Sequence, residues 1–157
     1  MDINRNKFVK ENPYDGSYFD LFDLPRMSCE NLTAYVTSED ATKVEKEAAI
    51  ADFEPAQKFL TVCGIEYGGG DLHGKQNCSK CIKCVRTMSG FYAMGKLDNF
   101  REVFDVDDYK AHLGRRLGRW FTFEHGGFVQ YFKRYAKMNG VRIPLSAYFY
   151  KWLLFRP

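Results

Sequence analysis

The sequence predicts an α+β fold that is mainly helical and is organised around a cluster of cysteines. Four of the five cysteines lie between residues 63 and 84, apolar residues recur at helical spacing from residue 81 onward, and residues 32–37 are β-branched and aromatic in character. With 157 residues, 45% of them hydrophobic, the chain can bury a core. We expect an irregular N-terminal segment with a short strand (1–40), a four-cysteine metal module (41–104) and a basic helical region (105–157).

The N-terminal segment contains few signs of regular structure. A turn cluster occupies residues 12–17, and Pro25 interrupts an aromatic run that begins at Tyr18. The stretch LTAYVT at 32–37 predicts the short strand. Cys29 stands apart from the other cysteines and no histidine lies near it, so we interpret it as a spare or buried thiol.

Two short helices are expected next. Thr42 followed by Glu45 fits a capping box, in which each residue bonds the backbone amide of the other, and predicts a helix from Lys43 to about Ala51. Glu54 and Pro55 predict the start of another helix, because proline at the first turn lacks only an amide that would have no partner.

The cysteine spacing is typical of a metal site. Two residues separate Cys78 from Cys81 and Cys81 from Cys84, and fourteen residues separate Cys63 from Cys78. The intervening loop contains five glycines, and Gly68, Gly69, Gly70 and Gly74 tolerate positive φ and allow the chain to fold back. Zinc replaces the thiol protons of such ligands, and Lys75, Lys80, Lys83 and Arg86 would offset the net charge of −2. His73, in the same loop, is the alternative to Cys63 as fourth ligand.

Three other interpretations of the cysteines compete with zinc. Disulfides are disfavoured by the odd number of cysteines and the crowding of the sulfurs. An iron–sulfur cluster would share the three-sulfur spacing, but no fourth cysteine and proline follow Cys84. Buried small hydrophobic residues would not show so regular a spacing. Four sulfur ligands leave zinc no open position, so we expect a structural Zn²⁺.

The rest of the chain is predicted to be helical. Apolar spacing supports a helix from Cys81 to Gly95, which carries two of the ligands on one face. We also expect short helices from Asp98 to Phe104, from about Asp108 to Trp120 with a cap at Asp105 or Asp107, from Phe128 to Met138 and from Leu145 to Phe155. In the helix at 108–120, Tyr109, Leu113, Leu117 and Trp120 form the apolar stripe, and Arg115, Arg116 and Arg119 lie on the other side.

Charge and apolar character bear on partners and location. Residues 110–157 carry 10 Lys and Arg against 1 acidic residue. This block makes nucleic acid a candidate partner, but basic helices are more often solvated, so we do not favour it. The aromatic helix at 145–155 predicts a homodimer or partner-chain contact, with peripheral membrane association as the weaker option. We find no transmembrane segment and no secretory leader, and the clustered thiols indicate the reducing cytoplasm.

The motif Thr42-Lys43-Val44-Glu45, then Cys63, then Cys78-x2-Cys81-x2-Cys84 and Arg86 resembles the C-terminal part of the 7-cyano-7-deazaguanine synthases of queuosine synthesis. These enzymes belong to the PP-loop, or adenine nucleotide α-hydrolase, superfamily. The stretch NCSKCIKCVRTM is similar to related proteins linked to surface-polysaccharide genes. The resemblance covers residues 13–110 and implies an α/β nucleotide α-hydrolase-like context, a structural zinc and substrate-side roles for Lys43, Glu45 and Arg86.

One feature of that family is missing. Its members bind ATP with a Ser-Gly-Gly-x-Asp-Ser loop, which this sequence lacks. Catalytic residues are unknown, since none of the three histidines belongs to a recognisable triad. We therefore expect the zinc-binding portion of an ATP-dependent ligase or amidating enzyme, inactive alone, that contributes a substrate-site wall or a dimer contact. The alternative is a free-standing zinc-stabilised binding module for nucleic acid or a protein partner.

Overall fold

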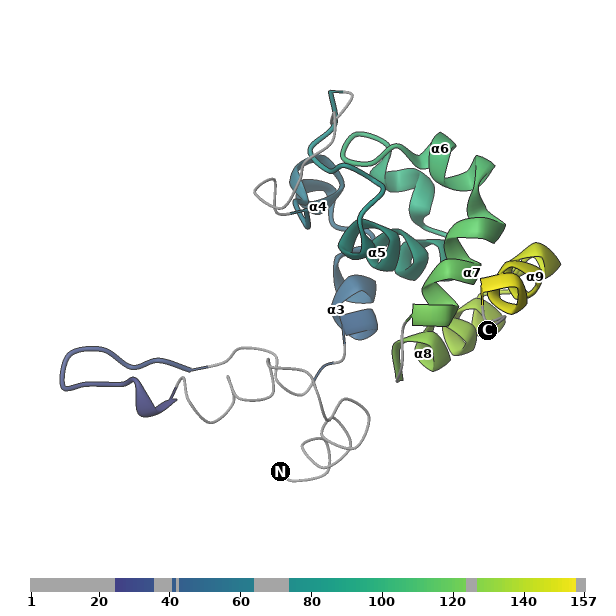
Figure 1. Ribbon diagram of the computed structural model, residues 1–157. Coiled ribbons are helices and arrows are strands. Elements are labelled where there is room, and N and C mark those ends of the chain that lie inside the picture. Colours follow the sequence, from purple (N-terminus) through teal and green to yellow (C-terminus); the bar gives the residue numbers. More distant parts are fainter. Residues whose placement is uncertain (1–24, 36–40, 42, 64–73, 124–126, 155–157) are drawn as a thin grey trace. The chain divides into compact units, whose positions relative to one another are not determined.

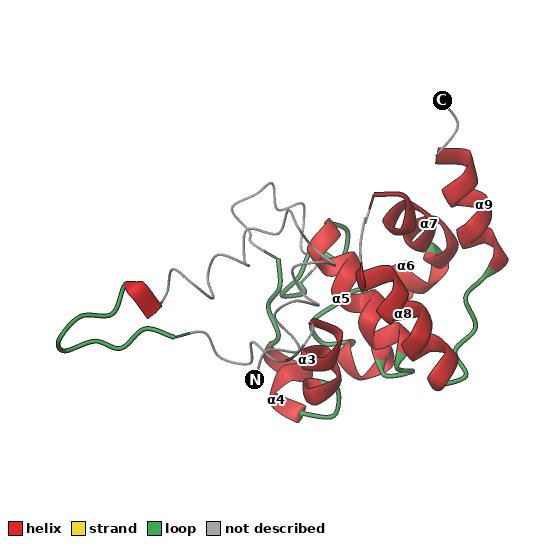
Figure 2. Ribbon diagram, turned by 90° about the horizontal axis from the view of Figure 1, so that it is seen from below, coloured by secondary structure: helices red, strands yellow, loops and turns green. Residues whose placement is uncertain are grey.

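The computed structural model describes residues 25–35, 41, 43–63, 74–123 and 127–154. The chain divides into two compact units, 1–43 and 44–157, and each is considered by itself. The described elements are all helical (Figures 1 and 2): α3 (Lys43–Ile50), α4 (Glu54–Phe59), α5 (Ile82–Ala93), the 3₁₀ helix η2 (Leu97–Phe100), α6 (Val106–Ala111), α7 (Leu113–Phe123), α8 (Gly127–Met138) and α9 (Leu145–Leu154). The prediction of a mainly helical chain is confirmed.

The first unit contains no strand in its described part. Cys29 and Leu32 form one isolated antiparallel bridge, and the Ala34 amide donates to Ser28 Oγ at 2.9 Å. The strand predicted at 32–37 is wrong across residues 32–35, while 36 and 37 lie outside the described residues. Its β-branched and aromatic side chains are mostly exposed here, and the described residues offer no partner strand to stabilise an extended pair.

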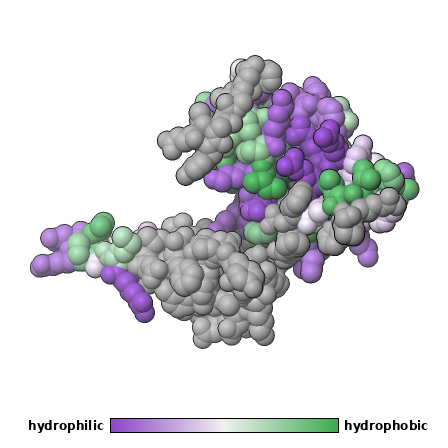
Figure 3. Space-filling model, viewed as in Figure 1, coloured by the Kyte–Doolittle hydropathy of each residue, from purple (hydrophilic) through white to green (hydrophobic). Residues whose placement is uncertain are grey.

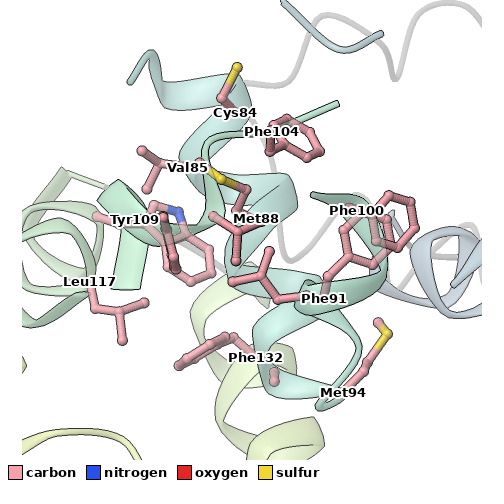
Figure 4. Close-up of a cluster of buried hydrophobic side chains, with 14 of the residues drawn as sticks. Cys84, Val85, Met88, Phe91, Met94, Phe100, Phe104, Tyr109, Leu117 and Phe132 are labelled. Carbon is pink, nitrogen blue, oxygen red and sulfur yellow. The ribbon is translucent and has the colours of Figure 1, made fainter. Parts of the chain in front are cut away.

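Helix α5 is the centre of the second unit. Nearly all of its length from Cys84 to Ala93 is buried, and η2, α7 and α8 pack around it. Figure 4 shows Met88 and Phe91 of this helix among Phe100, Tyr109 and Phe132. The Phe91 and Phe100 rings stack with centroids 3.7 Å apart. The core therefore forms around the helix that also carries the last cysteine of the cluster.

The end of α5 has the glycine that the sequence predicts. Gly95 has φ +70°, and the Lys96 amide donates to the Phe91 carbonyl at 2.9 Å. This is the left-handed stop that glycine accommodates without a Cβ clash. A buried polar contact joins α5 to α6, because Ser89 Oγ lies 2.7 Å from the Tyr109 hydroxyl.

The helix predicted at 108–120 is two helices. Asp105 caps α6 by accepting from the Asp108 amide at 3.0 Å, as the sequence predicts, but α6 ends at Ala111 and α7 begins at Leu113. The break aims two apolar faces at one core, with Tyr109 on α6 and Leu117 on α7 both fully buried. The helix expected from Asp98 to Phe104 is also shorter and occurs as η2.

Helix α9 packs against α7 at very close range. A Cβ at Gly118 would lie 2.6 Å from the Tyr150 Cβ and 2.7 Å from the Ala147 carbonyl oxygen. Only glycine at this position allows the two backbones to approach so far. The outer face of α9 remains exposed, and Figure 3 shows its hydrophobic colour beside the hydrophilic surface over α6. None of the described helices has the length and apolar character to cross a membrane.

Candidate metal centre

The four predicted ligands converge. Cys63 follows the α4 segment, Cys78 and Cys81 belong to the turn before α5, and Cys84 lies in the first turn of α5. Their four Sγ atoms all lie within 4.8 Å of one another. The Sγ separations are 3.3 Å for Cys63–Cys78, 3.4 Å for Cys81–Cys84, and 3.8 Å for both Cys63–Cys81 and Cys78–Cys84.

These separations fit a single metal ion. A disulfide would hold two sulfurs at about 2.05 Å, and all four cysteines are free thiols. Four sulfurs at about 2.3 Å from one tetrahedral ion lie about 3.8 Å apart, which agrees with the observed separations. Sulfurs that each bind a different iron of a cluster are spread more widely. The cluster can therefore hold a metal ion, and its geometry suits a mononuclear site.

The turn that carries Cys78 and Cys81 is shaped by its own backbone. Ser79 has φ +57°, an unusual value for a residue with a side chain, and it turns the chain between the two ligands. The Cys81 amide then points to Cys78 Sγ at 3.4 Å, and the Cys84 amide points to Cys81 Sγ at 3.5 Å. Cys81 is thus both a ligand candidate and the N-cap of α5. Amide donors of this kind favour thiolate sulfur.

Asn77, which sequence reasoning missed, joins the separate parts of the site. Its Oδ1 accepts from the amides of Val62 at 2.8 Å and Cys63 at 3.2 Å. Its Nδ2 donates to the carbonyls of Leu60 at 2.8 Å and Val103 at 3.1 Å. The side chain is buried, and these bonds place the Cys63 arm beside the Cys78 turn. The only sequence signal for this role is that the asparagine directly precedes Cys78.

The thiols of Cys63, Cys78 and Cys84 differ in pKa. Burial by itself would raise the pKa of Cys78, but the amides of Lys80 and Cys81 and the thiols of Cys63 and Cys81 outweigh it and lower the pKa to about 6. Burial raises the pKa of Cys84 far above its usual range. The Cys78 amide favours the Cys63 thiolate, yet burial and the neighbouring thiols raise the pKa of Cys63. An incoming metal ion must therefore displace protons, and metal affinity rises with pH.

A further layer of contacts supports the turn from the α6–α7 side. Ser79 Oγ accepts from the Asp105 amide at 2.8 Å, and Arg116 Nη1 donates to the Ser79 carbonyl at 2.6 Å. Arg116 also bonds the Asp108 carboxylate. Arg116, which the sequence places on the side of the helix away from the apolar stripe, is largely buried, because only 13% of its side chain is exposed. Its long side chain extends to the turn between Cys78 and Cys81.

The remaining predicted residues lie elsewhere. Lys43 and Glu45 are in the first turn of α3, and the Arg86 guanidinium lies 4.8 Å from the centroid of the Phe128 ring. Their substrate-side roles stay predictions. Thr42 and His73 lie outside the described residues. Cys29 is exposed and does not belong to the group of four, as expected of a spare thiol. Lys75 donates to the Arg101 carbonyl at 2.6 Å.

Comparisons with known protein families, with curated proteins and with solved structures find no significant match to this chain. The class of site therefore depends on the geometry of the four cysteines, and the resemblance to deazaguanine synthases depends on the sequence motifs alone.

Proposed function

We propose that the second unit, residues 44–157, is a structural zinc module in which the ion has no catalytic role. The observation that carries this proposal is the convergence of four cysteine Sγ atoms within 4.8 Å. Four thiolates fill every position of a tetrahedral ion, so neither water nor substrate can bind to it. All-sulfur tetrahedral sites select zinc or iron–sulfur clusters, and the short separations favour one zinc ion.

Zinc in this position would connect two parts of the chain that are far apart in sequence. Cys63 belongs to the arm after α4, whereas Cys84 is the buried start of the central helix α5. When bound, the ion supplies folding free energy, because the unfolded chain does not hold the four sulfurs together. The module would then present α6, α7 and α9 on a fixed frame.

The biochemical role that we propose for this module follows the sequence resemblance. It is the zinc-containing portion of a deazaguanine-synthase-like ATP-dependent ligase or amidating enzyme, contributing a wall of the substrate site or a dimer contact. The pattern of Cys63 with Cys78, Cys81 and Cys84 supports this role, since the four sulfurs meet as such a site requires. Without the Ser-Gly-Gly-x-Asp-Ser loop, the chain is not expected to activate a substrate with ATP by itself.

The alternative is a free-standing binding module, and a specific observation favours it. Exposed apolar side chains cover the outer face of α9, and the exposed Arg115 and Arg119 lie on the neighbouring α7. Monomeric proteins seldom leave such a patch uncovered. A protein partner would cover the α9 face, whereas nucleic acid would need the basic side chains. Salt-sensitive binding of a labelled oligonucleotide, measured by fluorescence anisotropy, would favour the nucleic-acid version, and its absence would remove that version.

The zinc module is tested by replacing single cysteines. Cys81→Ser and Cys84→Ser each remove a ligand, so we expect loss of the ion and of most helical circular dichroism at 37 °C. Cys29→Ser is the matched control, because Cys29 is exposed and outside the group of four. It should keep the metal content and the melting temperature of the wild type. Ligand variants that remain as stable as the wild type without metal would refute the structural role.

A further inference from the structure

A cavity of about 600 Å³ lies beside the metal centre. It opens between the cysteine turn with the first turn of α5 on one side and α6 with α7 on the other. Its volume falls in the range of pockets that hold small organic ligands. The side chains that line it are Lys80, Cys81, Ile82, Val85, Asp108, His112, Arg115, Arg116, Arg119 and Trp120.

The lining is rich in permanent positive charge. One lysine and three arginines face a single carboxylate, Asp108, which is already engaged by Arg116 and by His112 Nδ1 at 3.1 Å. Lys80 and Arg115 are exposed, and neither has an ion-pair partner among the residues that the structure describes. Their charges are therefore available to an anion that enters the cavity.

Arg116, which lines the cavity, is held rigidly. The Ser79 carbonyl and the Asp108 carboxylate fix its two terminal nitrogens, and its guanidinium lies 5.8 Å from the centroid of the buried Tyr109 ring. The contact to Ser79 connects the cavity directly to the turn between two metal ligands. A group held in advance loses little entropy when a ligand binds.

Neutralisation of the metal centre is the simpler explanation of these charges. Four thiolates around a divalent ion carry a net charge of −2, and Cys81 lies in the cavity wall. That explanation requires positive charge but no cavity. It also leaves unexplained why the same space is bordered by Ile82 and Val85, which offer an apolar surface to a ligand. A cavity lined by both cationic and apolar side chains is suited to an anionic group attached to an uncharged body.

We propose that this cavity binds a small phosphate-bearing ligand of nucleotide size. Lys80 and Arg115 contact the phosphate, while Ile82 and Val85 contact the uncharged part. A free nucleotide and one nucleotide unit of a single strand share this chemistry. The proposal goes beyond the structural role of the ion and requires only the folded, metal-loaded chain.

Isothermal titration calorimetry on the zinc-loaded chain at low ionic strength tests the proposal, with AMP, ribose 5-phosphate and adenosine as probes. We expect AMP to bind and adenosine, which lacks the phosphate, to bind at least about tenfold more weakly. The double variant Lys80→Ala/Arg115→Ala should weaken AMP binding by about tenfold or more. Its metal content is measured alongside, because Lys80 adjoins a ligand.

The matched control is Arg134→Ala/Lys137→Ala. It removes the same two charges from exposed positions on α8 that do not line the cavity, and it should leave AMP affinity within about twofold. Competition by a short single-stranded oligonucleotide would identify the strand as a source of the ligand and support the shared chemistry. No binding of AMP or ribose 5-phosphate, or an equal loss in both double variants, would overturn the proposal.

Discussion

The Asn77 side chain joins backbone segments that surround the four cysteines. A thiolate arm has to arrive at the right depth before an ion can bind, and the amide side chain of Asn77 bonds both the Cys63 arm and the backbone at Val103. The asparagine side chain offers one acceptor and two donor hydrogens at a fixed spacing, which makes it suited to joining separate backbone segments. The hydrogen bonds of Asn77 therefore order part of the site by themselves.

Replacing Asn77 with alanine should destabilise the protein without removing a metal ligand. Four buried or partly buried hydrogen bonds are lost, and the backbone groups at Leu60, Val62, Cys63 and Val103 are left without them, so we expect a loss of about 2–4 kcal/mol in the free energy of unfolding. Urea denaturation of the metal-loaded protein measures it.

Gln76→Ala is the neighbouring control for Asn77→Ala. The Gln76 side chain is exposed and its bonds to Thr61 and Lys58 lie at the surface, so the change should be within about 0.5 kcal/mol. Equal effects of the two substitutions would contradict the role that we give to Asn77.

At the scale of elements, the close packing of α7 and α9 depends on small residues that a hydrophobic pattern does not single out. Gly114 and Gly118 lie one turn apart on α7, opposite Ser146 and Tyr150 of α9. A sequence reading that counts apolar residues assigns α9 a buried face through its aromatics. The structure buries Ala147 instead and leaves Phe149 and Trp152 half exposed.

Gly118→Ala separates packing from helix propensity. In an open helical position this change would stabilise the protein by about 1 kcal/mol. Here the new methyl group would lie 2.7 Å from a backbone oxygen of α9, which cannot rotate away. We expect a net destabilisation of about 1–3 kcal/mol by thermal or urea unfolding. A stabilised variant would show that α9 is not seated on α7 as described.

Most of the helices and the turn from Cys78 to Cys84 could be predicted because their signals are local. Asp105, Gly95 and the cysteine spacing each specify a cap, a stop or a turn within a few residues. The break at His112 could not be predicted in this way. That break depends on the direction of two helices toward one core. The strand wrongly predicted at 32–35 has no partner strand among the described residues, and a local sequence pattern does not show whether a partner exists.

At the scale of the whole molecule, helix α9 leaves apolar side chains exposed on its outer face, and we propose that a partner chain covers them. Its exposed apolar side chains are Leu145, Tyr148, Phe149, Trp152, Leu153 and Leu154. The aromatic helix at 145–155 predicts a homodimer or partner-chain contact, and a second copy of this chain is the occupant that we favour. The charge of the neighbouring α7 would then lie at the edge of that contact.

The two tryptophans make this contact measurable. Trp120 is 2% exposed, whereas Trp152 is 52% exposed on the α9 face. If a second copy covers α9, light scattering should give a dimer, and Trp152→Ser should give a monomer with an unchanged metal content. Gln130→Ser, at an exposed position of α8, is the control and should remain dimeric. A wild-type monomer at every concentration would contradict the dimer and leave a different partner chain.

We propose above all that one zinc ion occupies the four-cysteine site and holds the fold together. Plasma mass spectrometry of the purified protein, with thiols counted before and after a chelator, tests it most directly. We predict one zinc per chain, one reactive thiol from the exposed Cys29 before chelation and five after it. Iron in place of zinc, or five reactive thiols in a folded protein without metal, would contradict it.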